Sequence, residues 1–198
     1  MFVISPIVEG HGEVEAVPPL IHRIAASVMP ALSFKVRPPI RVKADSFLAD
    51  TDYFRKHVSL AARWPAGQGG FVLILLDCED DCPATLGPSI RDQARAVRPD
   101  VDYVVTLAYR EFETWFIEAA PSLRGVAGLP GQLATPGNPT SIRDAKGWLS
   151  QHMPHGYDPI LHQTTMARCF DMHSARGNRS FDYFFRRVGE QIARSGSR

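Results

Sequence analysis

The segment that most constrains the fold is Phe71–Leu76, a run of apolar residues that ends directly at the acidic residue Asp77. Successive side chains of a strand point to opposite faces of its sheet, so a strand that is apolar throughout must be covered on both faces. Strands of this kind occur in parallel sheets that carry helices on each side. The segment therefore predicts an α/β protein in which Phe71–Leu76 is a central strand.

Strand-like and helix-like segments alternate along the first two thirds of the chain, with predicted strands at Phe2–Val8, Phe34–Lys43, Phe71–Leu76 and Tyr103–Ala108. The helical spacing of apolar residues between them predicts helices over 14–28, 50–64 and 88–97. Pro38 and Pro39 confine the second strand to a sheet edge. We therefore expect a mostly parallel four-stranded sheet, in the order second, first, third, fourth, flanked by helices.

The last third of the chain is predicted to be mainly helical. Apolar residues recur at helical spacing in 111–119 and 179–194, which directs six aromatic rings to the core: Phe112, Trp115, Phe116, Phe181, Phe184 and Phe185. We expect these rings to be core residues and not a base-stacking surface. Residues 121–140, rich in glycine and proline, would form a loop or lid. Residues 1–120 would then be the α/β core, and residues 121–198 the lid and the C-terminal helices that pack on it, within a single domain.

The composition excludes several classes of protein. No apolar run reaches the length of about eighteen residues that a membrane-spanning helix needs, so we expect no membrane partner. The N-terminus lacks the basic and apolar regions of a signal peptide, and three cysteines without such a peptide argue against a disulfide framework. These features predict a cytoplasmic protein. A net charge of +1 does not mark a nucleic-acid binder, so binding to DNA or RNA would depend on local patches.

Acidic residues follow two of the predicted strands at the point where each strand ends. Glu9 follows the first strand, and Asp77, Glu79 and Asp81 follow the third. Ligands of parallel sheets bind at these carboxyl ends. Clustered carboxylates raise one another's pKa, and a hard cation such as Mg²⁺ or Mn²⁺ relieves their repulsion. The pattern therefore predicts that these four acids are metal ligands. The alternative is an acidic turn that caps the next helix.

Three further acids are candidates for the same site. Glu13 follows Glu9 by one helical turn, and the glycines on either side of His11 suit a tight turn near a ligand. Glu111 and Glu113 follow the fourth predicted strand, so they also belong to the carboxyl edge of the sheet. Each of these acids also has an ordinary explanation, because a carboxylate in the first turn of a helix interacts favourably with the helix dipole.

Basic residues form two local groups that could hold phosphates. Alternate positions of the second predicted strand share one face and carry Lys35, Arg37, Arg41 and Lys43. The second group, Arg176 and Arg179, lies at the start of the last predicted helix. Basic residues on an edge strand also protect that edge from aggregation, which is the alternative explanation for the first group.

Three motifs taken together resemble a known family: VEGHGE at Val8–Glu13, REFETWF at Arg110–Phe116 and SARGNRSF at Ser174–Phe181. The first motif, followed by an apolar strand that ends in Asp77 and Glu79, resembles the Toprim domain of topoisomerases, bacterial primases and small ribonucleases. The whole set is similar to a bacterial family of Toprim-like proteins known as domain of unknown function 4276. Those motifs span nearly the whole chain.

The resemblance implies a Toprim-like, Rossmann-like fold and a role for each acid. Glu9 would be a general acid/base or a metal ligand, and Asp77 with Glu79 would bind Mg²⁺, which makes Glu9 and Asp77 the candidate catalytic residues. The Toprim pattern has aspartate at the position of Glu79, so either Glu79 substitutes for it or Asp81 takes its place. The implied activity is Mg²⁺-dependent phosphodiester cleavage of DNA or RNA. The alternatives are a non-catalytic module that binds metal, nucleotide or nucleic acid, and a phosphatase for small phosphoesters.

Overall fold

Two apolar strands, β1 (Phe2–Val8) and β4 (Phe71–Asp77), lie side by side at the centre of the sheet. The computed structural model describes residues 1–197. In that range all strands are parallel and follow the order β2–β1–β4–β5, where β2 is Phe34–Val36 and β5 is Asp102–Ala108. The predicted α/β class, the parallel sheet and the neighbouring positions of the first and third predicted strands are confirmed.

The expected second strand is divided in two, so the described part of the sheet has five strands and not four. β2 ends at Val36, and a separate short strand, β3 (Ile40–Arg41), pairs with the carboxyl end of β1. Pro38 and Pro39 lie between the two and have no backbone N–H to donate to β1, which explains the interruption. The prediction that this segment lies at a sheet edge is confirmed.

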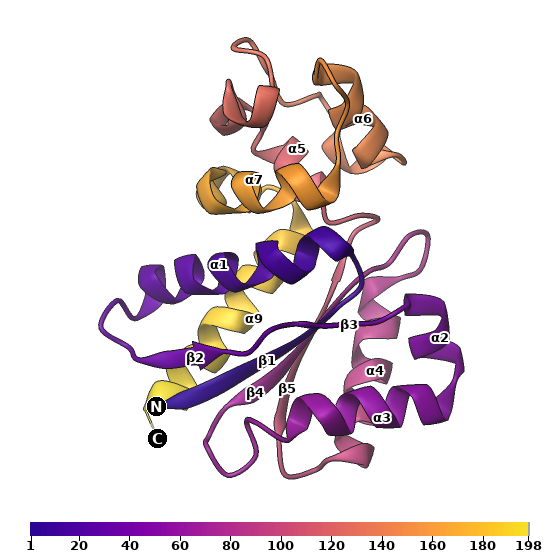
Figure 1. Cartoon of the computed structure of the whole chain (residues 1–198), viewed down its shortest axis with the longest axis vertical. Coiled ribbons are helices and arrows are strands. Elements are labelled where there is room, and N and C mark those ends of the chain that lie inside the picture. Colours follow the sequence, from indigo (N-terminus) through magenta and orange to yellow (C-terminus); the bar gives the residue numbers. More distant parts are fainter. Residues whose placement is uncertain (198) are drawn as a thin grey trace.

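Helices cover both faces of the sheet (Figure 1). One face packs against α1 (His11–Val28) and α9 (Arg179–Gly196). The other packs against α3 (Thr51–Ala62) and α4 (Pro83–Val97). Alternate residues of β4 supply the two cores, with Phe71, Leu73 and Leu75 on the first face and the even-numbered residues on the second. This division is the physical reason for the continuous apolar run.

The helix boundaries differ from the predictions mainly at their N-terminal ends. α1 begins at His11, so Pro18 and Pro19 lie in its interior and not in its first turn. α4 begins at Pro83, five residues before the predicted start at 88. α3 begins where expected, and Asp50 caps it by accepting from the N–H groups of Asp52 (2.9 Å) and Tyr53 (3.0 Å).

A helical cap covers the carboxyl ends of the strands, as the upper part of Figure 1 shows. Its helices are α5 (Thr114–Glu118), α6 (Ala145–His152), α7 (Thr164–Cys169) and α8 (Met172–Ala175), and a π-helical turn, η4 (Pro159–Gln163), leads into α7. The segment expected to be a loop contains the 3₁₀ turns η1 (Ala120–Leu123), η2 (Val126–Gly128) and η3 (Pro139–Ser141). A short helix, α2 (Ala44–Ala49), precedes α3.

The chain leaves the cap through α9, which runs back along the sheet to the end where the N-terminus lies (Figure 1). Five of the six rings predicted to be core are fully buried, namely Phe112, Trp115, Phe116, Phe181 and Phe184. Phe185 is partly buried, with the guanidinium of Arg176 over its ring. Within residues 1–197 no helix is long and apolar enough to cross a membrane.

A buried polar corner joins the cap to the sheet at the start of α9. The side chain of Asn178 accepts from the N–H groups of Ser180 (3.0 Å) and Phe181 (3.3 Å) and from the Ser180 hydroxyl (2.7 Å). That hydroxyl oxygen in turn accepts from the Trp115 indole (2.8 Å) and from the Tyr109 N–H (3.0 Å). Two of the three family motifs therefore meet here, and at this point they have a structural role.

Asn178→Ala removes the cap of α9 and leaves several buried donors without an acceptor. We expect the free energy of unfolding to fall by about 2 kcal/mol, because losing an N-cap and orphaning a buried hydrogen bond both destabilise. Urea unfolding followed by circular dichroism measures this. Asn138→Ala, at an exposed residue of the cap loop, is the control and should cost less than about 0.5 kcal/mol. Equal losses in the two variants would contradict the structural role of Asn178.

Candidate functional site: an acidic pocket at the carboxyl edge of the sheet

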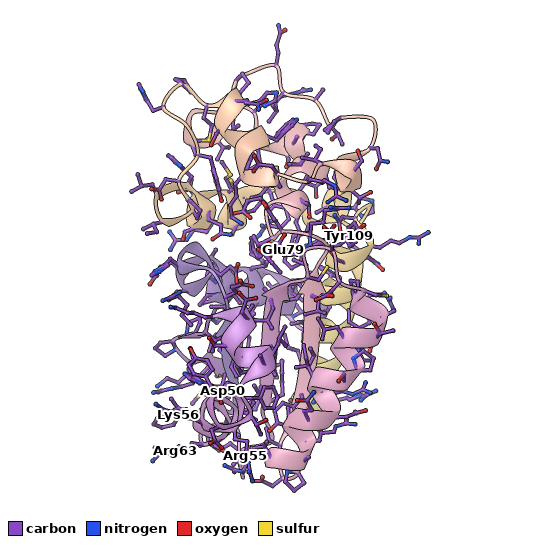
Figure 2. The ribbon with its side chains drawn as sticks, turned by 90° about the vertical axis from the view of Figure 1, so that its right-hand side faces the viewer. Asp50, Arg55, Lys56, Arg63, Glu79 and Tyr109 are labelled. Carbon is purple, nitrogen blue, oxygen red and sulfur yellow. The ribbon has the colours of Figure 1, made fainter. Side chains whose placement is uncertain are left out.

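The candidate site is a pocket of about 410 Å³ between the carboxyl ends of the strands and the helical cap. Figure 2 shows Glu79 and Tyr109, which follow β4 and β5, at the junction of the two parts. Six carboxyl groups line the pocket together with one ammonium group: Glu9, Glu13, Asp77, Glu79, Glu113, Asp158 and Lys146. Five of the acids come from three separate segments of sequence, each at the end of a strand, as the strand-end rule predicts, and Asp158 comes from the cap, where it precedes η4.

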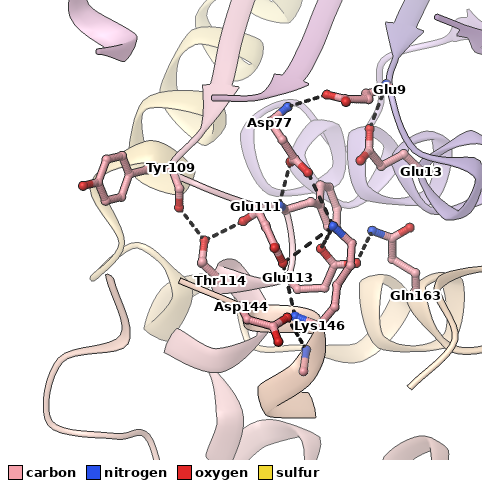
Figure 3. Close-up of polar contacts among 12 residues, drawn as sticks. Glu9, Glu13, Asp77, Tyr109, Glu111, Glu113, Thr114, Asp144, Lys146 and Gln163 are labelled. Carbon is pink, nitrogen blue, oxygen red and sulfur yellow. Dashed lines mark hydrogen bonds and ion pairs between the residues drawn. The ribbon is translucent and has the colours of Figure 1, made fainter. Parts of the chain in front are cut away.

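Glu9 and Asp77 are in direct contact across neighbouring strands. The Asp77 N–H donates to Glu9 Oε2 at 3.3 Å, so the carboxylate of the β1 end lies over the end of β4 (Figure 3). Asp77 Oδ1 accepts from the Phe112 N–H at 2.8 Å, which fixes the aspartate against the segment after β5. The structure thus brings together the two residues that the sequence singled out as catalytic.

Lys146, on α6, lies among the carboxylates, and the sequence analysis missed it. Its Nζ is 3.7 Å from Asp77 Oδ2, 3.6 Å from Glu111 Oε2 and 3.5 Å from Glu113 Oε2 (Figure 3). The Lys146 N–H also donates to Glu111 Oε2 at 3.1 Å, so Glu111 holds the first turn of α6. The Lys146 side chain is 43% exposed, which leaves its ammonium open to the pocket. No spacing in the sequence marks this lysine, because its partners lie more than thirty residues away.

Glu113 is buried and is held from the cap. Its Oε1 accepts from the Tyr157 hydroxyl at 3.0 Å and from Gln163 Nε2 at 3.4 Å. Its Oε2 has no hydrogen-bond donor within the described residues and only the Lys146 ammonium as an ion-pair partner. Gln163 Oε1 is also buried without a hydrogen-bond partner in that range. Two oxygen atoms of the pocket are therefore left with unused acceptor capacity.

Glu13 folds back over the start of its own helix. Its Oε2 accepts from the Glu9 N–H at 3.2 Å, a local contact of the kind made in a capping box. Gly12 is required by packing, since a Cβ there would collide with Gln163 Oε1 and with the Pro159 carbonyl. The second glycine of the VEGHGE motif thus lets η4 dock on α1, and this docking brings Gln163 to the pocket.

The three acids after Asp77 have different positions. Glu79 lines the pocket and has a left-handed backbone, with φ of 48°, which is unusual for a residue other than glycine and is found at functional sites. Asp80 lies outside and pairs with Arg110 (2.7 Å) and Arg143 (3.0 Å). Asp81 is exposed and does not line the pocket. Of the two alternatives for completing the site, Glu79 is therefore the residue placed at the pocket.

Burial is the main cause of the pKa shifts in the pocket. It raises the pKa of Glu13 from 4.5 to about 8, with the Glu113 charge as the next cause. Burial, followed by Glu13 and Glu113, raises the pKa of Asp77 well above its usual range. The pKa values of Glu9 and Glu113 are also raised by burial, and the positive charge of Lys146 opposes the increase in both cases. The pocket therefore keeps protons that exposed carboxyl groups would lose.

The donor set suits a hard divalent cation. Apart from the imidazole of His11, the side-chain acceptors are oxygen atoms, and the acidic groups outnumber the single ammonium, a balance that favours Mg²⁺ or Mn²⁺. In residues 1–197, however, no three His, Cys, Asp or Glu side chains are already grouped to hold a metal ion. The Lys146 ammonium separates Asp77, Glu111 and Glu113. Glu9 and Glu79 are at the more exposed side of the pocket, which we call its mouth. Binding a cation would thus require these two carboxylates to turn inward.

The predicted phosphate-binding residues are spread over the surface. Because the proline pair interrupts the second strand, Lys35, Arg37, Arg41 and Lys43 do not form one strand face, and Arg37 stacks on Trp64 with its guanidinium 3.8 Å from the ring centre. Arg176 pairs with Asp182 at 2.7 Å. Arg179 is exposed near the corner of α9. None of the six lines the acidic pocket, where Lys146 is the basic residue.

The chain belongs to the family described as domain of unknown function (DUF4276), whose model matches residues 8–189. The match includes all three motifs and every residue of the acidic pocket. No curated protein and no solved structure matches the chain.

Glu13→Gln tests the burial of charge in the metal-free protein. The folded-state pKa of Glu13, about 8, lies above 4.5, so between these values the folded protein keeps a proton that the unfolded chain releases. The protonated Glu13 side chain therefore makes its full contribution to the stability of the folded state below pH 4.5. This contribution is lost as the pH rises to about 8. Wild type should therefore lose up to about 1.4 kcal/mol of stability per pH unit from this group, and Glu13→Gln should remove that component.

The measurement is urea unfolding in chelator at several pH values between 5 and 8. Glu15→Gln is the matched control, because Glu15 is exposed on the same helix. That control should keep the wild-type dependence on pH. Parallel curves for wild type and Glu13→Gln would show that Glu13 is ionised in the folded protein at neutral pH.

Proposed function

We propose that this protein is a Toprim-like, Mg²⁺- or Mn²⁺-dependent hydrolase of phosphodiesters in DNA or RNA, acting at the pocket of Glu9, Asp77 and Glu79. The observation that carries the proposal is the convergence of six carboxyl groups and one ammonium on a single pocket, with five of the six acids at the carboxyl edge of a parallel sheet. An acidic turn that only caps a helix needs one acid, and none of the described residues provides α4 with a side-chain cap hydrogen bond.

The cation would be held at the mouth of the pocket by Glu9, Asp77 and Glu79. The inner acids are already engaged, since Glu113 contacts Lys146, Tyr157 and Gln163 and Glu13 contacts the backbone of Glu9. Glu9 is half-buried and Glu79 is exposed, so both can change rotamer at small cost. The bound ion would stabilise charge on the phosphate and lower the pKa of a bound water.

Two side chains would act on the substrate directly. Lys146 presents an ammonium to the pocket and would bind a non-bridging phosphate oxygen. Glu9, whose pKa is raised by burial, would accept a proton from the attacking water and return it to the leaving oxygen. Glu111 positions Lys146 through the backbone of α6, and the Phe112 N–H positions Asp77.

Two other functions remain as competing proposals: a module that binds metal with a nucleotide or nucleic acid without turnover, and a phosphatase for small phosphoesters. The products separate them. Cleaved polynucleotide supports the hydrolase, and release of inorganic phosphate from nucleotides supports the phosphatase. Metal binding without either product supports the binding module.

The first prediction concerns metal and stability. Asp77→Asn removes one charge from the crowded pocket, and its amide oxygen can still accept from the Phe112 N–H. Without metal the variant should be at least as stable as wild type. Wild type should gain about 2.7 kcal/mol when Mg²⁺ or Mn²⁺ is present at a hundred times its Kd, because the ion binds only the folded state. Asp77→Asn should lose most of this gain.

Thermal melts of both proteins, in chelator and in millimolar metal, measure the effect. Asp81→Asn is the control, since Asp81 is exposed outside the pocket, and it should keep the full gain. A wild-type melting temperature that neither ion changes would contradict the metal site.

The second prediction concerns activity. Wild type with Mg²⁺ or Mn²⁺ should cleave labelled single- or double-stranded DNA or RNA, and Glu9→Gln should lower the rate by about 100-fold or more, the usual loss for a general acid/base. Lys146→Met should raise KM as well as lower kcat, because it removes a phosphate contact. Glu15→Gln should match wild type. Gel assays across the four substrates measure these rates, and an absence of metal-dependent cleavage in all of them would refute the hydrolase.

A further inference from the structure

A second hollow, larger than the acidic pocket, runs along the free edge of the sheet. It has a volume of about 880 Å³ and lies between α4 and α9, beside β5. Its floor is formed by Val105 and Leu107, and its walls by small residues of α4, Ala84 and Gly87, facing Tyr183 of α9. We call it the edge groove. It shares no lining residue with the acidic pocket, so it is not part of the site described above.

The floor of the edge groove carries strand backbone groups that no residue in the described range 1–197 pairs. β5 bonds to β4 on one side only. The Ala108 carbonyl accepts from the Cys78 N–H at 3.0 Å, which turns the even-numbered residues of β5 toward β4 and the odd-numbered ones away from it. The Tyr109 N–H, also turned away, donates to Ser180 at 3.0 Å. Within residues 1–197 the outward N–H and C=O groups of Val105 and Leu107 have no partner.

These unpaired groups are recessed. Val105 is 6% exposed and Leu107 is 4% exposed, so their backbone groups lie at the bottom of an apolar groove. Buried backbone donors and acceptors are nearly always hydrogen-bonded in native proteins. The alternation of outward N–H and C=O groups along β5 matches the backbone of one further parallel strand. Adding a strand to an open sheet edge is a general mode of peptide recognition.

One end of the edge groove carries an unpaired positive charge. Arg179 lines the groove where α9 begins, beside the carboxyl end of β5. Its side chain makes no ion pair or hydrogen bond with residues 1–197. The N-terminus of the eighteen-residue α9 adds positive potential at the same point. A strand that ran parallel to β5 would bring its own carboxyl end to this charge.

We propose that the edge groove binds an extended peptide segment of a partner protein, parallel to β5, with the carboxylate of the partner's C-terminus at Arg179. Main-chain hydrogen bonds to Val105 and Leu107 hold the segment. Its inward side chains lie against Ala84, Gly87 and Tyr183.

The shape and charge of the edge groove favour this occupant over two others. A second copy of the chain would present β5 from the bottom of its own groove, so α4 and α9 of the two copies would collide before the strands could pair. A nucleic-acid strand would need several cations to neutralise its phosphates, and Arg179 is the one basic residue that lines the groove in the described part of the chain.

The probe is a fluorescein-labelled pool of peptides of about five residues, the usual strand length, with threonine alternating with valine, leucine or tyrosine. Fluorescence polarisation should show saturable binding with a micromolar Kd. Amidation of the peptide C-terminus and Arg179→Gln should each weaken binding about tenfold, and together no more than either alone, because both remove the same charge-assisted contact. N-methylation of the alternate peptide residues whose N–H groups face β5 should abolish binding.

Gly87→Leu should abolish binding by filling the edge groove. A Cβ at Gly87 meets no atom within 4 Å, so the larger side chain fits the folded protein. Ala84→Trp is a second blocking variant, in case leucine before Pro88 strains the helix. Ala96→Leu is the control on the same helix, at an exposed residue that does not line the groove, and it should bind like wild type. Hydrogen exchange should show that the peptide protects the amides of Val105 and Leu107.

Three results would overturn the proposal. The first is the absence of binding by the free-carboxylate pool. The second is binding that Gly87→Leu and Ala84→Trp leave intact. The third is a different occupant: a labelled oligothymidylate that binds in a Gly87→Leu-sensitive way where the peptides do not, or a wild-type dimer that Gly87→Leu dissociates in sedimentation. The outcome is independent of the hydrolase proposal, because no readout involves cleavage or metal.

Discussion

The ammonium of Lys146 is the contact on which the junction of sheet and cap depends. It lies within 3.7 Å of oxygen atoms of Asp77, Glu111 and Glu113, which follow two adjacent strands. The ammonium offsets part of the repulsion among these acids, while the hydrophobic cluster shared by cap and sheet supplies the apolar part of the junction. The acidic residues therefore do more than line a pocket, because through Lys146 they also contact α6.

The pocket is divided into an inner part and an outer part by how its charge is compensated. The inner acids are compensated by Lys146, by the hydroxyl of Tyr157 and by raised pKa values. Burial also raises the pKa of Tyr157, so its hydroxyl stays a donor to Glu113. The outer acids, Glu9 and Glu79, are more exposed, and Glu9 accepts from one backbone N–H and is only partly compensated by the charge of Lys146. This uneven compensation is why we assign the cation to the mouth and the phosphate contact to Lys146.

The sequence predicted the parts of this arrangement that follow from the geometry of regular strands. An all-apolar strand must be central, and the ends of neighbouring parallel strands must meet, so Glu9, Asp77 and Glu79 could be placed near one another before any coordinates. The break of the second strand could also have been read from Pro38 and Pro39, which were interpreted only as an edge signal. What failed there was the assumption that a strand with two missing donors stays continuous.

The residues that the sequence did not reveal come from the cap, where no periodicity places them. Lys146, Tyr157 and Gln163 reach the pocket from α6, the following loop and η4, and their contacts with Glu111 and Glu113 span 35 to 50 residues. A single lysine in a short helix looks like any solvated charge. Finding it would have required the path of the chain through irregular turns, which depends on packing details such as the contact of Gly12 with Pro159.

The motifs that identify the family are of two kinds, and this difference limits what membership implies. Gly12, Trp115, Asn178 and Ser180 hold the fold together through close packing and buried hydrogen bonds. Their loss would cost stability in this chain whatever its chemistry. Glu9, Asp77 and Lys146 are different: together they crowd charge into a buried pocket, at a cost that the contacts of Lys146 offset only in part. A match over residues 8–189 therefore establishes membership of the family, whereas the activity has to be argued from those three side chains.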